Sequence, residues 1–180
     1  IEPPTWALLL AESVRSTGYR PGILDVAAEN LTEADAAKKI QEINPRLICF
    51  VVYGQNPNSG TVNMSAAVAL SRKIKQLLIN SPICFVGSHI SALPLEVLEK
   101  EKSIDIVLCN EGVYSLRELL AEDLGNLDSI KHVRGIGIRE DDRPTLTEPA
   151  NIVPQSRMDI DLPGYAWDLL PYREKPLDLY

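Results

Sequence analysis

The strongest constraint on the fold of this chain comes from three short runs of apolar residues. Stretches with helical periodicity separate these runs. The runs cover residues 46–53, 83–87 and 104–110, and each is largely apolar at successive rather than alternate positions. Strands of this kind are buried on both faces, as in a parallel sheet that helices cover on both sides. The sequence therefore predicts an α/β domain with a doubly wound, mainly parallel sheet of the Rossmann-like or flavodoxin-like kind.

The segments between and around these runs predict the remaining elements. Residues 4–18 repeat apolar side chains at helical spacing up to Gly18, and Thr32 is placed to cap a helix over 32–44. A small β-hairpin is expected from strands at 133–140 and 144–149. The other expected elements are a short strand at 22–26, helices at 62–80, 94–101 and 113–125, and a loop at 88–94.

Composition narrows the class of partner. The 180 residues carry a net charge of -7, with a pI near 4.9, whereas nucleic acids and anionic membranes require a basic face. The longest apolar run is strand-sized, far below the ~18 residues expected of a membrane span. Cys49, Cys84 and Cys109 stand in separate apolar runs, which is typical of reduced, buried thiols. We therefore expect a cytoplasmic protein without nucleic-acid, membrane or cysteine-bound metal partners.

Three loops should share the edge of the sheet at which such domains bind their ligands. They are residues 53–61, 87–91 and 110–112, and each follows one of the apolar runs. Ligands of open α/β sheets bind at the carboxyl ends of the strands, and small residues allow close backbone approach. A flat ligand at this edge is the functional interpretation. The alternative for the first loop is a passive turn, because Asn, Pro, Ser and Gly are also turn formers.

A phosphate-binding loop is the first idea that residues 53–61 suggest, and it fails. Five residues separate Gly54 from Gly60, where a Walker-type loop has four, and no lysine follows Gly60. No G-x-G-x-x-G opens any helix either. His89 has no partner at metal-ligand spacing, which favours a capping or hydrogen-bonding role. Glu111 could bind a ligand or a neighbouring helix N-terminus.

Several segments, taken in order, resemble the cobalamin-binding domain of radical S-adenosylmethionine enzymes. "PPTWALLLAESVRSTGY" is similar to the opening helix of that family, and "VGSHISALPLEVL" to its Gly-Gly-x-His segment. "IDIVLCNEGVYSLRELL" resembles its segment with Gly-Glu-Gly-Glu, and "DLPGYAWDLLP" the linker before its radical domain. The resemblance extends over nearly the whole chain.

The resemblance implies cobalamin as the cofactor and a methyltransferase as the whole enzyme. Residues 53–61 would meet the lower face and side-chain amides of the corrin, and the other two loops would line the cleft for the nucleotide tail. No residue of the chain is expected to ligate the metal or to act catalytically. The implied cofactor-binding residues are Tyr53, Gly54, Gln55, Asn56, Ser59, Gly60, Thr61, Gly87, Ser88, His89, Ser91, Asn110, Glu111 and Gly112.

The sequence also departs from the family pattern. Ser88 and Asn110 stand where glycines are common, and Val113 replaces the second glutamate. The Cys-x-x-x-Cys-x-x-Cys motif is absent from these residues, so S-adenosylmethionine and a 4Fe-4S cluster would belong to a radical domain in cis. The family's first strand would precede Ile1. The rival hypothesis is a degenerate docking module that no longer binds cobalamin.

Three parts of the chain are expected from these patterns. Residues 1–130 would form the cobalamin-binding-like α/β domain, and residues 131–150 its β-hairpin extension. Residues 151–180 are rich in proline and would form the linker toward the radical domain.

Overall fold

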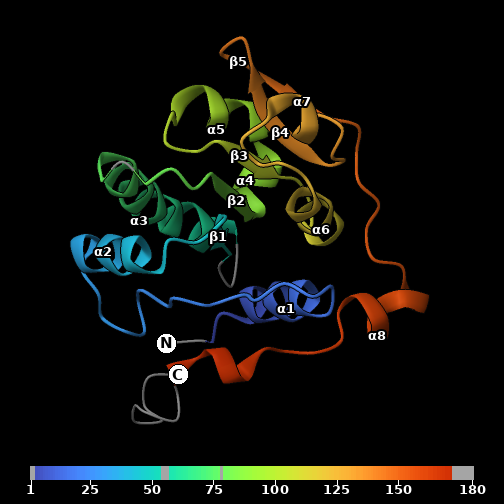
Figure 1. The fold of residues 1–180 in the computed structure, drawn as a ribbon, viewed down its shortest axis with the longest axis horizontal. Coiled ribbons are helices and arrows are strands. Elements are labelled where there is room, and N and C mark those ends of the chain that lie inside the picture. The colour runs from blue at the N-terminus through green and yellow to red at the C-terminus, as the bar shows by residue number, and fades with distance from the viewer. Residues whose placement is uncertain (1–2, 54–56, 78, 172–180) are drawn as a thin grey trace.

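One five-stranded sheet organises the computed structural model, which describes residues 3–53, 57–77 and 79–171, without the side chains of residues 57–62. The strands lie side by side in chain order (Figure 1). They are β1 (Ile48–Val52), β2 (Ile83–Gly87), β3 (Ile106–Leu108), β4 (Ile136–Glu140) and β5 (Arg143–Leu146).

Parallel pairing joins the first three strands, and a hairpin completes the sheet. β1 pairs with β2 and β2 with β3 in parallel, with Ile48 opposite Ile83 and Cys84 opposite Ile106. β4 pairs antiparallel with both β3 and β5. Asp141 and Asp142 connect β4 to β5 with φ angles of 49° and 62°, as the primed hairpin turns require. The predicted fold class and hairpin are thus confirmed, and the hairpin extends the main sheet.

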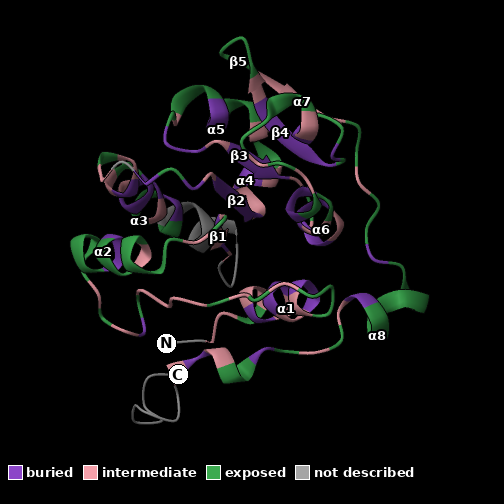
Figure 2. Cartoon of the chain, viewed as in Figure 1, coloured by how far each residue is buried: buried purple, intermediate pink, exposed green. Residues whose placement is uncertain are grey.

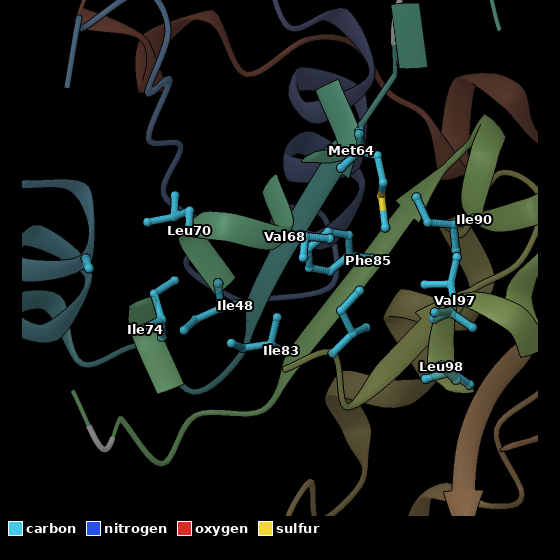
Figure 3. Packing of buried hydrophobic residues seen from close by; sticks show 14 of the residues in the cluster. Ile48, Met64, Val68, Leu70, Ile74, Ile83, Phe85, Ile90, Val97 and Leu98 are labelled. Atoms are coloured by element: carbon cyan, nitrogen blue, oxygen red, sulfur yellow. The ribbon is translucent and has the colours of Figure 1, made fainter. Parts of the chain in front are cut away.

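Helices cover both faces of the sheet, as predicted (Figures 1 and 2). One core joins the sheet to α2 (Glu33–Ile43), α3 (Pro57–Gln76), α4 (Ser88–Ala92) and α5 (Pro94–Lys100). The other joins it to α1 (Thr5–Arg15), α6 (Val113–Ala121) and α7 (Leu127–Ile130). Every residue of β2 is buried, and Phe85 lies at the centre of the first core, near Val68 (Figure 3). No helix among the described residues is long and apolar enough to cross a membrane.

Two helix boundaries follow the sequence signals. The Thr32 side chain accepts a hydrogen bond from the backbone N–H of Asp35, which makes Thr32 the N-cap of α2. The first turn of α2 also carries Glu33, whose charge favours a helix N-terminus. α1 ends at Arg15, and Gly18 follows with a φ of 94°.

Three local expectations were wrong. Residues 22–25 have no regular secondary structure and Val26 begins a turn, because no strand among the described residues pairs with them, and Leu24 and Val26 pack on the core instead. The loop expected at 88–94 is mostly the helix α4. α3 begins at Pro57 rather than at residue 62, because proline suits the first position of a helix.

The chain after the hairpin folds back over the domain. Residues 151–171, which we name the C-terminal strap, pass α6, reach α8 (Met158–Asp161) and return beneath α1 (Figure 1). The strap also contains two 3₁₀ turns, Gln155–Arg157 and Trp167–Leu169. The backbone N–H of Ala166 donates to the carbonyl oxygen of Leu8 in α1 at 3.3 Å. The strap is therefore attached to the α/β domain.

Candidate functional site

A hollow of about 330 Å³ lies where the carboxyl ends of the three parallel strands meet. Tyr53 follows β1, Ser91 belongs to the helix after β2, and Asn110 and Glu111 follow β3. Trp6, in the first turn of α1, completes the lining. The structure thus brings at least one residue from each of the three predicted segments together at one edge, as the parallel topology requires.

Two aromatic rings form one wall of this hollow. The rings of Trp6 and Tyr53 lie 5.6 Å apart at an angle of 57°. The indole Nε1 of Trp6 donates to the carbonyl oxygen of Glu111 at 3.1 Å, and the Tyr53 hydroxyl donates to that of Asn110 at 3.1 Å. Burial, followed by the negative charge of Glu111, raises the pKa of Tyr53, so its phenol stays protonated at neutral pH. Both rings are therefore held in place by long-range hydrogen bonds.

The turn after β3 depends on left-handed backbone conformations. Asn110 has a φ of 55° and Gly112 a φ of 72°. Asparagine tolerates this region better than other side chains, which explains how Asn110 can stand where the resembling family has glycine. At Gly112 an added Cβ would lie 2.9 Å from Cγ2 of Val86, so glycine is needed there for packing as well.

Glu111 has a specific partner within the chain. Its Oε2 accepts a hydrogen bond from the backbone N–H of Val153 in the strap, at 2.9 Å. The side chain that was expected to bind a ligand or a helix N-terminus therefore holds the strap against the binding edge.

Gly87 ends β2 where the backbone of β1 comes close. A Cβ at this position would collide with the carbonyl oxygen of Val52 and lie 3.2 Å from Cδ1 of Ile90. Glycine is thus required by packing between neighbouring strands, whatever the ligand. Ser91 donates from its hydroxyl to the carbonyl oxygen of Asn110 at 3.5 Å.

The other predicted site residues either lie beside the hollow or belong to the part of the chain that the structure does not describe in full. Ser88 and His89 lie in the first turn of α4 and do not line the hollow. Ser59, Gly60 and Thr61 are in the first turns of α3, and their side chains are not described. Gly54, Gln55 and Asn56 lie outside the described residues.

A larger hollow, of about 570 Å³, lies at the N-terminus of α2. Its lining residues follow no strand of the sheet, and none of them belongs to the three loops. We place the candidate site at the smaller hollow because strand ends and helix starts converge there. Leu31, Thr32, Glu33, Ala34 and Lys73 line the larger one.

Among the described residues, no three His, Cys, Asp or Glu side chains come together as a metal site. The three cysteines are free thiols, but only Cys84 is fully buried. Cys49 and Cys84, distant in sequence, are direct neighbours across β1 and β2. The hydrogen bond with Cys49, followed by burial, raises the pKa of Cys84. Desolvation also raises the pKa of Cys109.

The fold and the hollow define an α/β domain whose candidate ligand site lies at the carboxyl ends of the three parallel strands. A family model for the B12 binding domain matches residues 1–120, and the chain belongs to this family. The resemblance seen in the sequence is thereby confirmed.

Individual relatives agree with this assignment. The uncharacterized methyltransferase PH0819 of Pyrococcus horikoshii is 27% identical over 169 residues, which are 94% of this chain and 34% of the relative. The cobalamin-dependent S-adenosylmethionine radical enzyme OxsB with aqua-cobalamin bound has a TM-score of 0.71 at 17% identity. The radical S-adenosylmethionine methyltransferase TsrM from Kitasatospora setae, with cobalamin and a 4Fe-4S cluster, has a TM-score of 0.61 at 15% identity.

The chain corresponds to only part of these proteins. It spans about a third of the length of the curated relative. The matches cover 92% of this chain and 22% of OxsB, and 85% of this chain and 28% of TsrM. At these identities the two solved structures show the shared fold.

Proposed function

We propose that this chain binds cobalamin at the carboxyl edge of its sheet and orients it for methyl transfer in a radical S-adenosylmethionine methyltransferase. The observation that carries the proposal is the hollow formed by Trp6, Tyr53, Ser91, Asn110 and Glu111 in a member of the B12-binding family. At about 330 Å³ it is at the lower end of the ~300–1,000 Å³ range of ligand pockets, so it would hold one part of a corrinoid.

The residues at this edge fit such a cofactor. Trp6 and Tyr53 offer ring surfaces to an apolar part of the ligand, and Ser91 offers a hydroxyl to a polar one. A corrin ring supplies its own nitrogen ligands to cobalt, so the protein need not supply a cluster of metal ligands. Gly87, Ser88, His89 and Gly112 would support this edge beside the hollow.

The residues after β1 complete the proposed site. Gly54, Gln55, Asn56, Ser59, Gly60 and Thr61 would approach the corrin and its side-chain amides through small side chains and backbone groups. When bound, cobalamin supplies a cobalt centre that accepts and passes on a methyl group. The chain itself would bind the cofactor, fix its orientation and keep water from the buried part of the ligand.

The reaction would require a second domain. The sequence relative is named a methyltransferase, and the structural relatives are larger radical enzymes. We place S-adenosylmethionine and the iron–sulfur cluster in a radical domain of the same polypeptide, with residues 1–150 as the cobalamin-binding part and the following residues as the connection. A cytoplasmic location fits the three free thiols.

Retention of a corrinoid tests the proposal. The purified protein is mixed with hydroxocobalamin and desalted, and its visible spectrum is recorded. Corrin absorbance that elutes with the protein in a one-to-one ratio is the expected result. A colourless protein fraction would favour the docking module that does not bind cobalamin.

A further inference from the structure

The C-terminal strap is fixed to the domain along its inner side. Val153 donates its backbone N–H to Glu111, and Ala166 donates to Leu8. The two terminal guanidinium nitrogens of Arg15, Nη1 and Nη2, each donate to the carboxylate of Asp168 at 3.0 Å. The strap side chains that point inward and are buried are Val153, Asp161, Ala166 and Leu170.

A buried carboxylate makes the strongest of these attachments. The side chain of Asp161 is only 2% exposed, and it accepts hydrogen bonds from the Tyr114 hydroxyl at 2.6 Å and from Arg117 at 2.8 Å. Arg157 contributes two further bonds, at 2.7 and 3.0 Å. Arg117 also bonds the backbone oxygens of Ser13 and Asp161, which ties α1, α6 and α8 together. A carboxylate with this many donors makes the strap a fixed part of the structure.

The outer side of the strap exposes large apolar side chains among polar ones. Five of the ten exposed large hydrophobic side chains among the described residues lie within residues 152–167. The rings of Tyr165 and Trp167 lie 5.8 Å apart. These five are Ile152 (62% exposed), Met158 (48%), Ile160 (59%), Tyr165 (46%) and Trp167 (44%).

We propose that these exposed apolar side chains on the strap mark the docking surface for a second folded domain of the same polypeptide. Large exposed apolar surface on a fixed segment is typical of an interface, and Trp, Tyr and Met are enriched at such surfaces. The relatives supply the occupant, because the match covers 34% of the length of one and 22–28% of the length of the others. The identity of that domain as the radical domain rests on the proposed function.

The same contacts connect the docking surface to the candidate site. Glu111 lines the hollow, its carbonyl oxygen accepts from Trp6, and its carboxylate holds the start of the strap. A domain that docks on the strap is thereby kept at a set position relative to the hollow. The strap thus positions the partner domain in addition to connecting it.

The two methionines of the chain provide an internal comparison for the test. Met64 is 7% exposed in the core, and Met158 is 48% exposed on the strap. The intact polypeptide, containing this chain and its following domain, is exposed to hydroxyl radicals without cobalamin, and oxidation of both peptides is measured by mass spectrometry. We expect Met158 to lose its reactivity and to be oxidised as slowly as Met64. Oxidation of Met158 at the rate of an exposed methionine would overturn the proposal.

A matched pair of variants tests the docking surface by a second route. In the intact polypeptide, Ile160→Asp should separate the domains, with a larger radius of gyration in small-angle X-ray scattering and faster cleavage between the domains. Ile43→Asp changes a side chain on α2 that is 66% exposed, against 59% for Ile160, and should leave the radius of gyration and the cleavage rate unchanged. Unchanged scattering for Ile160→Asp, or a dimer in which a second copy protects Met158, would refute docking in cis. Since neither readout needs cobalamin, failure of docking and failure of corrinoid retention are separate results.

Discussion

Removal of the negative charge of Asp161 should destabilise the protein strongly. In Asp161→Asn the shape is kept, but the amide nitrogen is a donor and faces a hydroxyl and two guanidinium groups that are donors too. Loss of one partner from a buried ion pair costs about 3–5 kcal/mol. Arg157 is half-exposed and can regain water, so we expect the lower end, about 3 kcal/mol.

This loss is large enough to measure by thermal unfolding. For a domain of this size about 3 kcal/mol corresponds to a Tm lower by roughly 6–12 °C. Circular dichroism at pH 7 is the assay. Asp168→Asn is the matched control, because that carboxylate is 60% exposed in its pair with Arg15 and should contribute about 1 kcal/mol at most. Equal Tm values for the two variants, or a wild-type Tm for Asp161→Asn, would refute the reasoning.

The difference in Tm between the wild type and Asp161→Asn should also depend on pH. Hydrogen bonds from Arg157 and then from Tyr114 hold the pKa of Asp161 well below its usual range. A carboxyl group whose pKa is lowered on folding stabilises the protein fully above its unfolded pKa of about 3.9 and progressively less below it. The Tm gap between wild type and Asp161→Asn should therefore be widest near neutral pH and narrow below about pH 4.

Three further changes test the site and the core. Trp6→Ala should weaken hydroxocobalamin binding about tenfold, because it removes one of the two rings in the wall of the hollow. Trp167→Ala should leave the affinity unchanged, and equal affinities of the two variants in a titration would contradict the role of Trp6. Gly87→Ala should lower the free energy of unfolding by about 1–3 kcal/mol, because the added Cβ collides with β1. Gly22→Ala, whose Cβ meets nothing within 4 Å, should change the free energy of unfolding by about 0.5 kcal/mol or less. Denaturant unfolding measures both values, and a larger loss for Gly22→Ala than for Gly87→Ala would contradict the reasoning. Cys84 should react with Ellman's reagent at pH 8 only after unfolding, since burial and a raised pKa both protect it; fast labelling of the folded protein would contradict this.

Features that depend on residues close together in the sequence were predicted well. The apolar runs became β1, β2 and β3 because each is long enough for a strand and apolar on both faces. Thr32 became an N-cap because capping is a contact over three residues. Residues 22–26 have the composition of a strand, but no strand among the described residues pairs with them, and composition alone cannot show whether a partner strand is present.

The candidate site also has features that the sequence predicts and features that it does not. Its location at the carboxyl edge follows from parallel topology, which the alternation of strands and helices predicts. Trp6 was expected only as an apolar helix residue, because its bond to Glu111 spans 105 positions in the sequence. The bond from Val153 to Glu111 spans 42 positions and could not be predicted from local pattern.

A hydrogen-exchange footprint of hydroxocobalamin tests the central claim most directly. Deuterium uptake is measured by mass spectrometry on the protein with and without the corrinoid. The claim that cobalamin binds at the carboxyl edge predicts slower exchange in residues 87–91 and 110–112, with α5 unchanged. Unchanged exchange at both loops, or protection around Leu31 and Lys73 at the larger hollow, would contradict it.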